Sequence, residues 1–159
     1  MYQIRKSFLI FFIFSLSIIS ILSAFYIEYV LKYPPCSLCL IQRIPYYLSL
    51  VICSVFFFSR KYDKIILQLI LINFIISFLL SFYHFGIEMS LFEESSLCST
   101  TKQNFDSPVD LLKSLDIVQI SCKSVTFKIL GFSLATINLL LNSVIIIITF
   151  ISLKNYEKN

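Results

Sequence analysis

The stretch FLIFFIFSLSIISILSAFYI, residues 8–27, contains no charged residue in 20 positions. A helix needs about 20 such residues to cross the roughly 30 Å hydrocarbon core of a bilayer. Three further uncharged runs follow, of 16, 19 and 25 residues: Ile44–Ser59, Ile65–Tyr83 and Ile129–Leu153. Because these runs are too long and continuous for the strands of a membrane barrel, we expect four transmembrane helices.

The second run is shorter than the others and spans only about 24 Å as a helix. It still crosses the bilayer if Leu40 and Ile41 extend it and Arg43 snorkels outward. We therefore expect one all-α domain over residues 1–159, an integral membrane four-helix bundle. Its expected helices cover about 8–28, 41–59, 64–84 and 128–153, and its outside loops cover about 29–40 and 85–127.

The composition supports this assignment, because 58% of the residues are apolar and only 14% are charged. A soluble domain of 159 residues leaves too much of its surface wet to hide that many apolar side chains. The expected surroundings are therefore a lipid bilayer. The net charge is +4, but the basic residues are scattered at the ends of the apolar runs and form no continuous stripe. We therefore expect no nucleic-acid partner. The first run is too long for a signal peptide and lacks a small-residue cleavage site, so we expect a retained helix.

The basic residues predict the orientation, because short cytoplasmic segments are enriched in Lys and Arg. With both termini cytoplasmic, the inside segments hold seven basic residues in about twenty positions: Arg5, Lys6, Arg60, Lys61, Lys64, Lys154 and Lys158. The outside segments hold six, spread more thinly and offset by acidic residues that include Glu28, Glu88, Glu93 and Glu94. We expect a bacterial inner (cytoplasmic) membrane protein with both termini inside.

Four of the five cysteines then fall outside the cytoplasm, two in each loop. Cys36 and Cys39 lie in the first loop and Cys98 and Cys122 in the second, whereas Cys53 lies within the second run and reads as an apolar filler. Paired thiols on the oxidising side of a membrane are expected to form disulfides or to exchange with them.

The first pair forms a C-x-x-C, Cys36-Ser37-Leu38-Cys39, which suits exchange better than stapling. If Cys36 lies in the first turn of a helix, the free N–H groups favour its thiolate. Pro45 means that the following helix either begins there or kinks. The alternatives are a structural disulfide or half of a zinc site, although zinc wants four ligands and the chain has one histidine.

Cys98 and Cys122 lie 24 positions apart. A disulfide between them would close a long loop and stabilise the folded protein by roughly 3–4 kcal/mol in the chain-entropy model. The alternative to a redox pair is therefore a purely structural disulfide. Ser107, Pro108 and Asp110 resemble the start of a helix, and Leu111, Leu112, Leu115 and Val118 share one face. This pattern predicts a short amphipathic helix on the membrane surface.

Three polar residues complete the candidate site: Arg43, His84 and Glu88. Arg43 follows Cys39 by four positions, a spacing that places both on one helix face. Arg43 is either an ordinary interfacial arginine that snorkels outward or a fixed cation that stabilises a thiolate or the anion of a reduced quinone. His84 and Glu88 are also four apart and either cap a helix end or help to bind quinone and move protons. The small and polar residues Asn73, Gly131, Asn138 and Asn142 indicate helix packing.

The chain resembles the DsbB family of disulfide-bond-formation membrane proteins. The segment Cys36–Arg43 is similar to the family's C-x-L-C-x-x-x-R signature, and Tyr83–Glu88 is similar to its Y-H-x-G-V-E stretch. Cys122 followed by Leu130–Ala135 and Asn138 resembles the start of its last helix. Lys123 departs from the acidic residue that many relatives carry after the last cysteine, and Pro45 is not typical.

The resemblance implies a quinone-linked thiol oxidase, a protein-disulfide-generating quinone oxidoreductase. A periplasmic thioredoxin-like thiol oxidase, similar to DsbA, attacks the Cys98–Cys122 disulfide, with Cys98 as the preferred target. Exchange passes the electrons to Cys36–Cys39. A membrane quinone, ubiquinone or menaquinone, then reoxidises that pair near Arg43, and His84 and Glu88 assist in binding it.

Two other functions fit parts of the pattern. A membrane scaffold or assembly protein with two structural disulfides needs the same cysteines but no electron transfer. Another four-helix quinone or vitamin K-type reductase is the second alternative, although such enzymes carry their C-x-x-C on a late helix.

Overall fold

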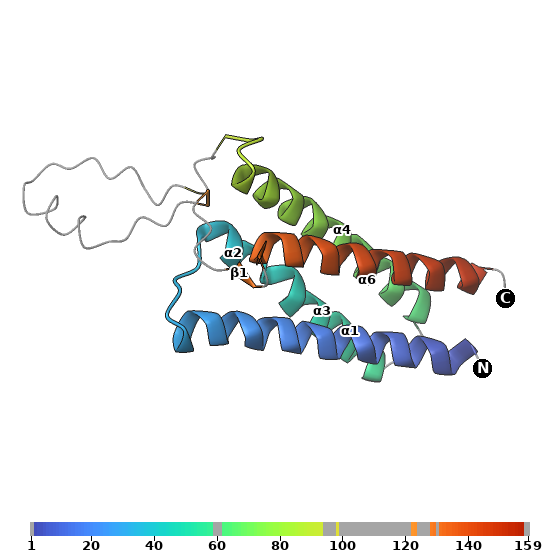
Figure 1. Cartoon of the computed structure of the whole chain (residues 1–159). Coiled ribbons are helices and arrows are strands. Elements are labelled where there is room, and N and C mark those ends of the chain that lie inside the picture. Colours follow the sequence, from blue (N-terminus) through green and yellow to red (C-terminus); the bar gives the residue numbers. More distant parts are fainter. Residues whose placement is uncertain are drawn as a thin grey trace, which may run out of the picture.

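The computed structural model describes residues 2–58, 62–93, 98, 122–123, 128–129 and 131–157. Within them, four segments are long and apolar enough to cross a membrane: Ser7–Val30, Ser37–Phe58, Asp63–Glu88 and Leu134–Asn155. They form a bundle whose N- and C-terminal ends lie at the same end of the molecule (Figure 1). The expectation of an all-α four-helix membrane bundle is confirmed.

The first span combines an α-helix with a wider turn. Helix α1 covers Tyr2–Phe25, and the π-helical segment η1 continues it over Tyr26–Val30. In η1 the backbone N–H of Leu31 reaches the carbonyl of Tyr26, five residues back. Such π-turns place side chains off the regular helical stripe and are frequent at functional sites. Here the π-turn carries Glu28, the only acidic residue among the first 62 positions.

The second span is broken in two. Helix α2 covers Ser37–Ile41, a turn follows at 42–43, and α3 covers Ile44–Phe58. Pro45 has no N–H to offer the carbonyl four residues back, so a continuous helix cannot form across this point. The sequence left open whether Pro45 begins or kinks the helix. In the structure it lies in the first turn of α3, where a proline is tolerated.

Two helices complete the bundle. Helix α4 covers Asp63–Glu88, and α6 covers Leu134–Glu157. The expected fourth helix starts earlier, at about 128, but a hairpin of β1 (Lys128–Ile129) and β2 (Phe132–Ser133) occupies its first residues. Gly131 permits this turn because its φ is +87°, a backbone conformation that residues with a side chain rarely adopt. The amphipathic helix expected near 108–118 lies outside the described residues.

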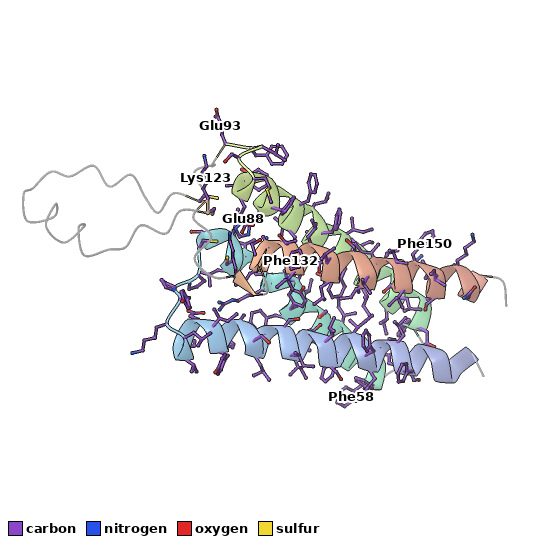
Figure 2. The ribbon with its side chains drawn as sticks, viewed as in Figure 1. Phe58, Glu88, Glu93, Lys123, Phe132 and Phe150 are labelled. Carbon is purple, nitrogen blue, oxygen red and sulfur yellow. The ribbon has the colours of Figure 1, made fainter. Side chains whose placement is uncertain are left out.

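Several polar side chains lie inside the bundle among apolar ones, and many large apolar side chains are exposed on its outside. Phe58 is 93% exposed, and Figure 2 shows it and Phe150 projecting from the bundle. Inside, the hydroxyls of Ser17 and Ser49 lie 2.7 Å apart and join α1 to α3. Asn73 of α4 donates to the carbonyl of Pro45 at 2.8 Å. Because the surrounding solvent is lipid, such hydrogen bonds and close packing hold the helices together.

Gly86, near the end of α4, is buried under an aromatic ring. A Cβ at this position would lie 2.1 Å from Cδ2 of Phe92, whose ring stacks on Tyr83 with centroids 5.8 Å apart. The backbone N–H groups of Leu91 and Phe92 both donate to the carbonyl of Gly86, so the chain folds back over it. The glycine therefore makes room for the turn that ends α4.

We expect Gly86→Ala to destabilise the protein by about 1–3 kcal/mol, because the new methyl group displaces the Phe92 ring. Thermal unfolding in detergent, followed by circular dichroism, measures the effect. In a Phe92→Ala background the clash is gone, and the same substitution becomes neutral or stabilising because alanine favours a helix by about 1 kcal/mol. An equal loss in both backgrounds would refute the proposed packing role of Gly86.

Candidate thiol redox site

Four cysteines meet at the end of the bundle that lies away from the two termini. Cys36, Cys98 and Cys122 are buried in one cluster with Leu38 and Ile87. Cys39 is half-buried and packs against that cluster. The two pairs that the sequence places in separate loops are therefore brought together. Cys53 lies apart, fully buried in the apolar core between the helices.

Cys36 is the N-cap residue of α2. Its backbone is extended (φ −72°, ψ 165°), and its Sγ accepts a hydrogen bond from the backbone N–H of Cys39 at 3.3 Å. The Sγ atoms of Cys36 and Cys39 lie 2.8 Å apart, both as thiols. This is the helix-start geometry expected to favour a thiolate. The contact with Cys39 and burial nevertheless raise the pKa of Cys36 to about 12, against a hydrogen bond with His84 that lowers it.

Cys122 touches both pairs. Burial raises the pKa of its thiol, a hydrogen bond with Cys98 lowers it, and a hydrogen bond with Cys36 raises it. Cys98 and Cys122 are 1% and 2% exposed. The Cys122 sulfur is thus within reach of one sulfur from its own loop and one from the other. Disulfide exchange requires a thiolate and a disulfide to come into such contact.

His84 and Glu88 belong to this site and do not merely cap α4. Nε2 of His84 lies 3.7 Å from Sγ of Cys36 and 3.9 Å from Oε1 of Glu88. Ser133 donates from its hydroxyl to Glu88 and accepts from the backbone N–H of Thr136, so it links the end of α4 to the start of α6. Figure 2 shows Glu88 at this junction.

Arg43 points toward the first span. Its Nη1 lies 2.6 Å from Oε2 of Glu28, and its guanidinium carbon lies 5.4 Å from the centre of the Phe25 ring. The contact with Glu28 is an ion pair and not an aligned hydrogen bond. Because the helix breaks at 42–43, Arg43 and Cys39 do not share one regular helix face, yet both line the same cavity.

Sequence reasoning missed Glu28 and Gln42 as parts of the site. Glu28 reads in the sequence only as a loop charge, although a lone carboxylate at the edge of an apolar run signals a partner within the bundle. Gln42 stands beside Arg43 in the signature stretch and donates from its amide to Nδ1 of His84 at 3.2 Å. Asn138, which the sequence indicates as a packing residue, contacts Gln42 at 3.1 Å.

A cavity of about 330 Å³ opens beside the thiols. Its walls are mainly apolar side chains of α1 and α6, and its polar end is formed by Cys36, Cys39, Arg43, His84 and Glu88. Pockets for small organic molecules have this character, with a few polar groups that orient the ligand.

The cluster of Cys36, Cys39 and His84 also has three potential metal ligands within 4.8 Å of one another. Two thiolates on one tetrahedral zinc ion lie about 3.8 Å apart, given Zn–S bonds of about 2.3 Å. The sulfurs here are 2.8 Å apart, which is too close for that arrangement. Two sulfurs this close can form and break a disulfide, which is the chemistry that the pair offers.

Comparisons with known proteins agree with this chemistry. The family model described as "Disulfide bond formation protein DsbB" matches residues 6–152. The "Uncharacterized protein RP370" of Rickettsia prowazekii (strain Madrid E) is 34% identical over 143 residues, which cover 84% of this chain and 79% of that protein. No solved structure matches significantly. The family match spans almost the whole chain, including both cysteine pairs, three of the four apolar segments in full and most of the fourth, so this multi-pass membrane protein belongs to the DsbB family and its general role is oxidoreductase chemistry in disulfide bond formation.

Proposed function

We propose that the protein oxidises a periplasmic thioredoxin-like thiol oxidase and transfers the electrons to membrane quinone. The observation that carries this proposal is that Cys122 lies in one buried cluster with both Cys98 and Cys36. Two purely structural disulfides have no need of such a contact. Membership of the DsbB family also supports a role in disulfide bond formation.

The exchange starts at the Cys98–Cys122 disulfide of the oxidised protein. A thiolate of the reduced partner attacks Cys98, a mixed disulfide forms, and Cys122 leaves as a thiolate. The second thiol of the partner then displaces Cys98, so that the partner leaves with a disulfide. Two electrons and two protons now reside on Cys98 and Cys122.

The electrons then pass between the loops. The Cys122 thiolate attacks Cys36 of the Cys36–Cys39 disulfide, forms a Cys36–Cys122 bond and releases the Cys39 thiolate. Cys98 next attacks Cys122, which restores the Cys98–Cys122 disulfide and leaves Cys36 and Cys39 reduced. Every bond in this sequence forms between sulfurs that share one cluster.

The cavity beside Cys39 suits a quinone. Apolar walls accept a ring and part of a lipid tail, while Arg43 offers N–H groups for ring oxygens at the polar end, which His84 also lines. A quinone bound there, ubiquinone or menaquinone, supplies an acceptor for the two electrons and two protons of the Cys36–Cys39 dithiol. Glu28 holds Arg43 and offsets its charge, so the guanidinium is positioned before any ligand arrives.

The proposed location is the inner membrane, with the thiols on the periplasmic side. Both termini lie at the opposite end of the bundle from the cysteine cluster (Figure 1). The segments at the terminal end carry the denser group of basic residues, which is typical of the cytoplasmic side.

Cys36→Ala is expected to abolish oxidation of the partner, because the second pair then has no disulfide to exchange with. Acid quenching and thiol trapping of membranes measure the redox state of the partner, and Cys53→Ala serves as the control that removes a thiol outside the cluster. A partner that stays fully oxidised with Cys36→Ala would rule out the quinone-linked route. A scaffold with structural disulfides predicts that outcome.

Arg43→His is expected to keep both disulfides but to lower the efficiency of quinone reduction about tenfold, because the rigid guanidinium fork at the cavity is lost. Stopped-flow absorbance of a soluble quinone measures the rate with purified protein and reduced partner. Lys154→His removes an exposed cation at the far end of α6 and is expected to change nothing. Unchanged quinone kinetics in Arg43→His would remove Arg43 from the proposed site.

A further inference from the structure

A chain of hydrogen bonds runs from the middle of the bundle to the thiols. It passes from Ser81 of α4 through Asn138 of α6 to Gln42 and His84. Amides and imidazoles have distinct donor and acceptor ends, so each link limits the orientation of the next. If one group in this chain of hydrogen bonds is known to donate or to accept, the direction of every other hydrogen bond in it follows.

Ser81 is such a group. Its hydroxyl lies 2.8 Å from the backbone carbonyl of Ser77, which can only accept, so the hydroxyl proton is used there. Toward its other neighbours Ser81 Oγ is consequently an acceptor. The amide nitrogens of Asn138 and Asn142 donate to it at 2.9 and 3.1 Å.

This orientation passes to Gln42. Because Asn138 presents its NH₂ group to Ser81, the same NH₂ faces Gln42, which must offer its carbonyl oxygen, at 3.1 Å. The hydroxyl of Tyr46 donates to the other end of the Asn138 amide. The NH₂ group of Gln42 then faces the carbonyl of Leu80 at 3.3 Å and Nδ1 of His84 at 3.2 Å. Leu80 supplies an independent check, because its carbonyl also can only accept.

We propose that Gln42 and Asn138 are positioning residues that hold neutral His84 with its hydrogen on Nε2, directed at the sulfur of Cys36. A donor at Nδ1 requires a lone pair there, and a neutral imidazole then carries its hydrogen on Nε2. That nitrogen lies 3.7 Å from Sγ of Cys36, within reach of an N–H···S hydrogen bond. The carboxylate of Glu88, at 3.9 Å, lies on the same side.

The consequence deepens the proposed function, on which it rests. When Cys98 attacks Cys122 of a Cys36–Cys122 bond, the electron pair of the broken bond goes to Cys36. The Nε2–H of His84 donates a hydrogen bond to the resulting thiolate and keeps its proton. The opposite tautomer would present a lone pair to that negative charge and oppose the step.

Nitrogen NMR tests the assignment directly, because His84 is the only histidine of the chain. The reduced full-length protein, labelled with ¹⁵N-histidine and held in detergent micelles, gives one imidazole. It is observed at a pH alkaline enough that the ring signals no longer move. We expect a protonated, pyrrole-type Nε2 and an unprotonated, pyridine-type Nδ1. A protonated Nδ1 in this spectrum would overturn the proposal, and the measurement needs no variant.

Two variants test the positioning role. Gln42→Glu places an acceptor beside Nδ1, and Asn138→Asp forces Gln42 to turn its NH₂ group away from His84. Both are expected to put a proton on Nδ1. Asn73→Asp adds the same charge inside the bundle at a side chain whose amide donates to the carbonyl of Pro45, and is expected to leave Nδ1 unprotonated. If Nδ1 stays unprotonated in a folded Gln42→Glu variant, Gln42 does not control the ring.

The functional effect is measured separately. Gln42→Glu is expected to slow exchange between the loops about tenfold in rapid-quench thiol trapping, because a hydrogen bond to a charged sulfur is lost. An unchanged rate would refute the role of the tautomer in exchange. If wild-type protein shows the expected spectrum but never oxidises a thiol partner, the proposed function fails and the tautomer assignment stands.

Discussion

Pro45 prevents the second membrane span from forming one continuous helix, and the rest of the site depends on that break. The missing N–H ends the regular ladder near Ile41, and the turn at 42–43 sends neighbouring side chains to different partners. Gln42 reaches α4 and α6, whereas Arg43 reaches Glu28 in the first span. The short helix α2 is therefore a separate helix, which begins at its own N-cap, Cys36. An uninterrupted helix would keep these groups on one regular spiral and would not join three helices at one point.

Lipid explains why the polar side chains around His84 hydrogen-bond to one another. Because there is little water inside a bilayer, a buried amide or hydroxyl must find its hydrogen-bond partners within the protein. Ser81, Asn138 and Gln42 satisfy one another and also define which nitrogen of His84 faces the thiols. The same hydrogen bonds therefore serve two purposes, since they hold α4 against α6 and they orient the group beside Cys36. Stability and chemistry are coupled at this end of the molecule.

Sequence patterns predicted the four spans well, because uncharged apolar runs of this length are typical of membrane-crossing helices. They also predicted the helix start at Cys36, and they named the two cysteine pairs, Arg43, His84 and Glu88 as candidates, whose roles stay predictions. They did not predict that the two pairs touch, because the approach of Cys122 to Cys36 depends on how the loops pack. Glu28 escaped notice because a π-turn has no sequence signature. The hairpin before α6 interrupts a run that contains no charged residue, and Gly131 was its one local signal.

Direct movement of electrons between the two cysteine pairs requires that Cys36 and Cys122 can form a disulfide. The Cys39→Ser/Cys98→Ser double variant tests this, because it keeps Cys36, Cys122 and the distant Cys53. After mild oxidation of membranes, non-reducing peptide mass spectrometry identifies the disulfides. The account predicts a bond between Cys36 and Cys122, formed without denaturation. Recovery of both cysteines as unlinked thiols, under conditions that oxidise the wild-type pairs, would contradict it.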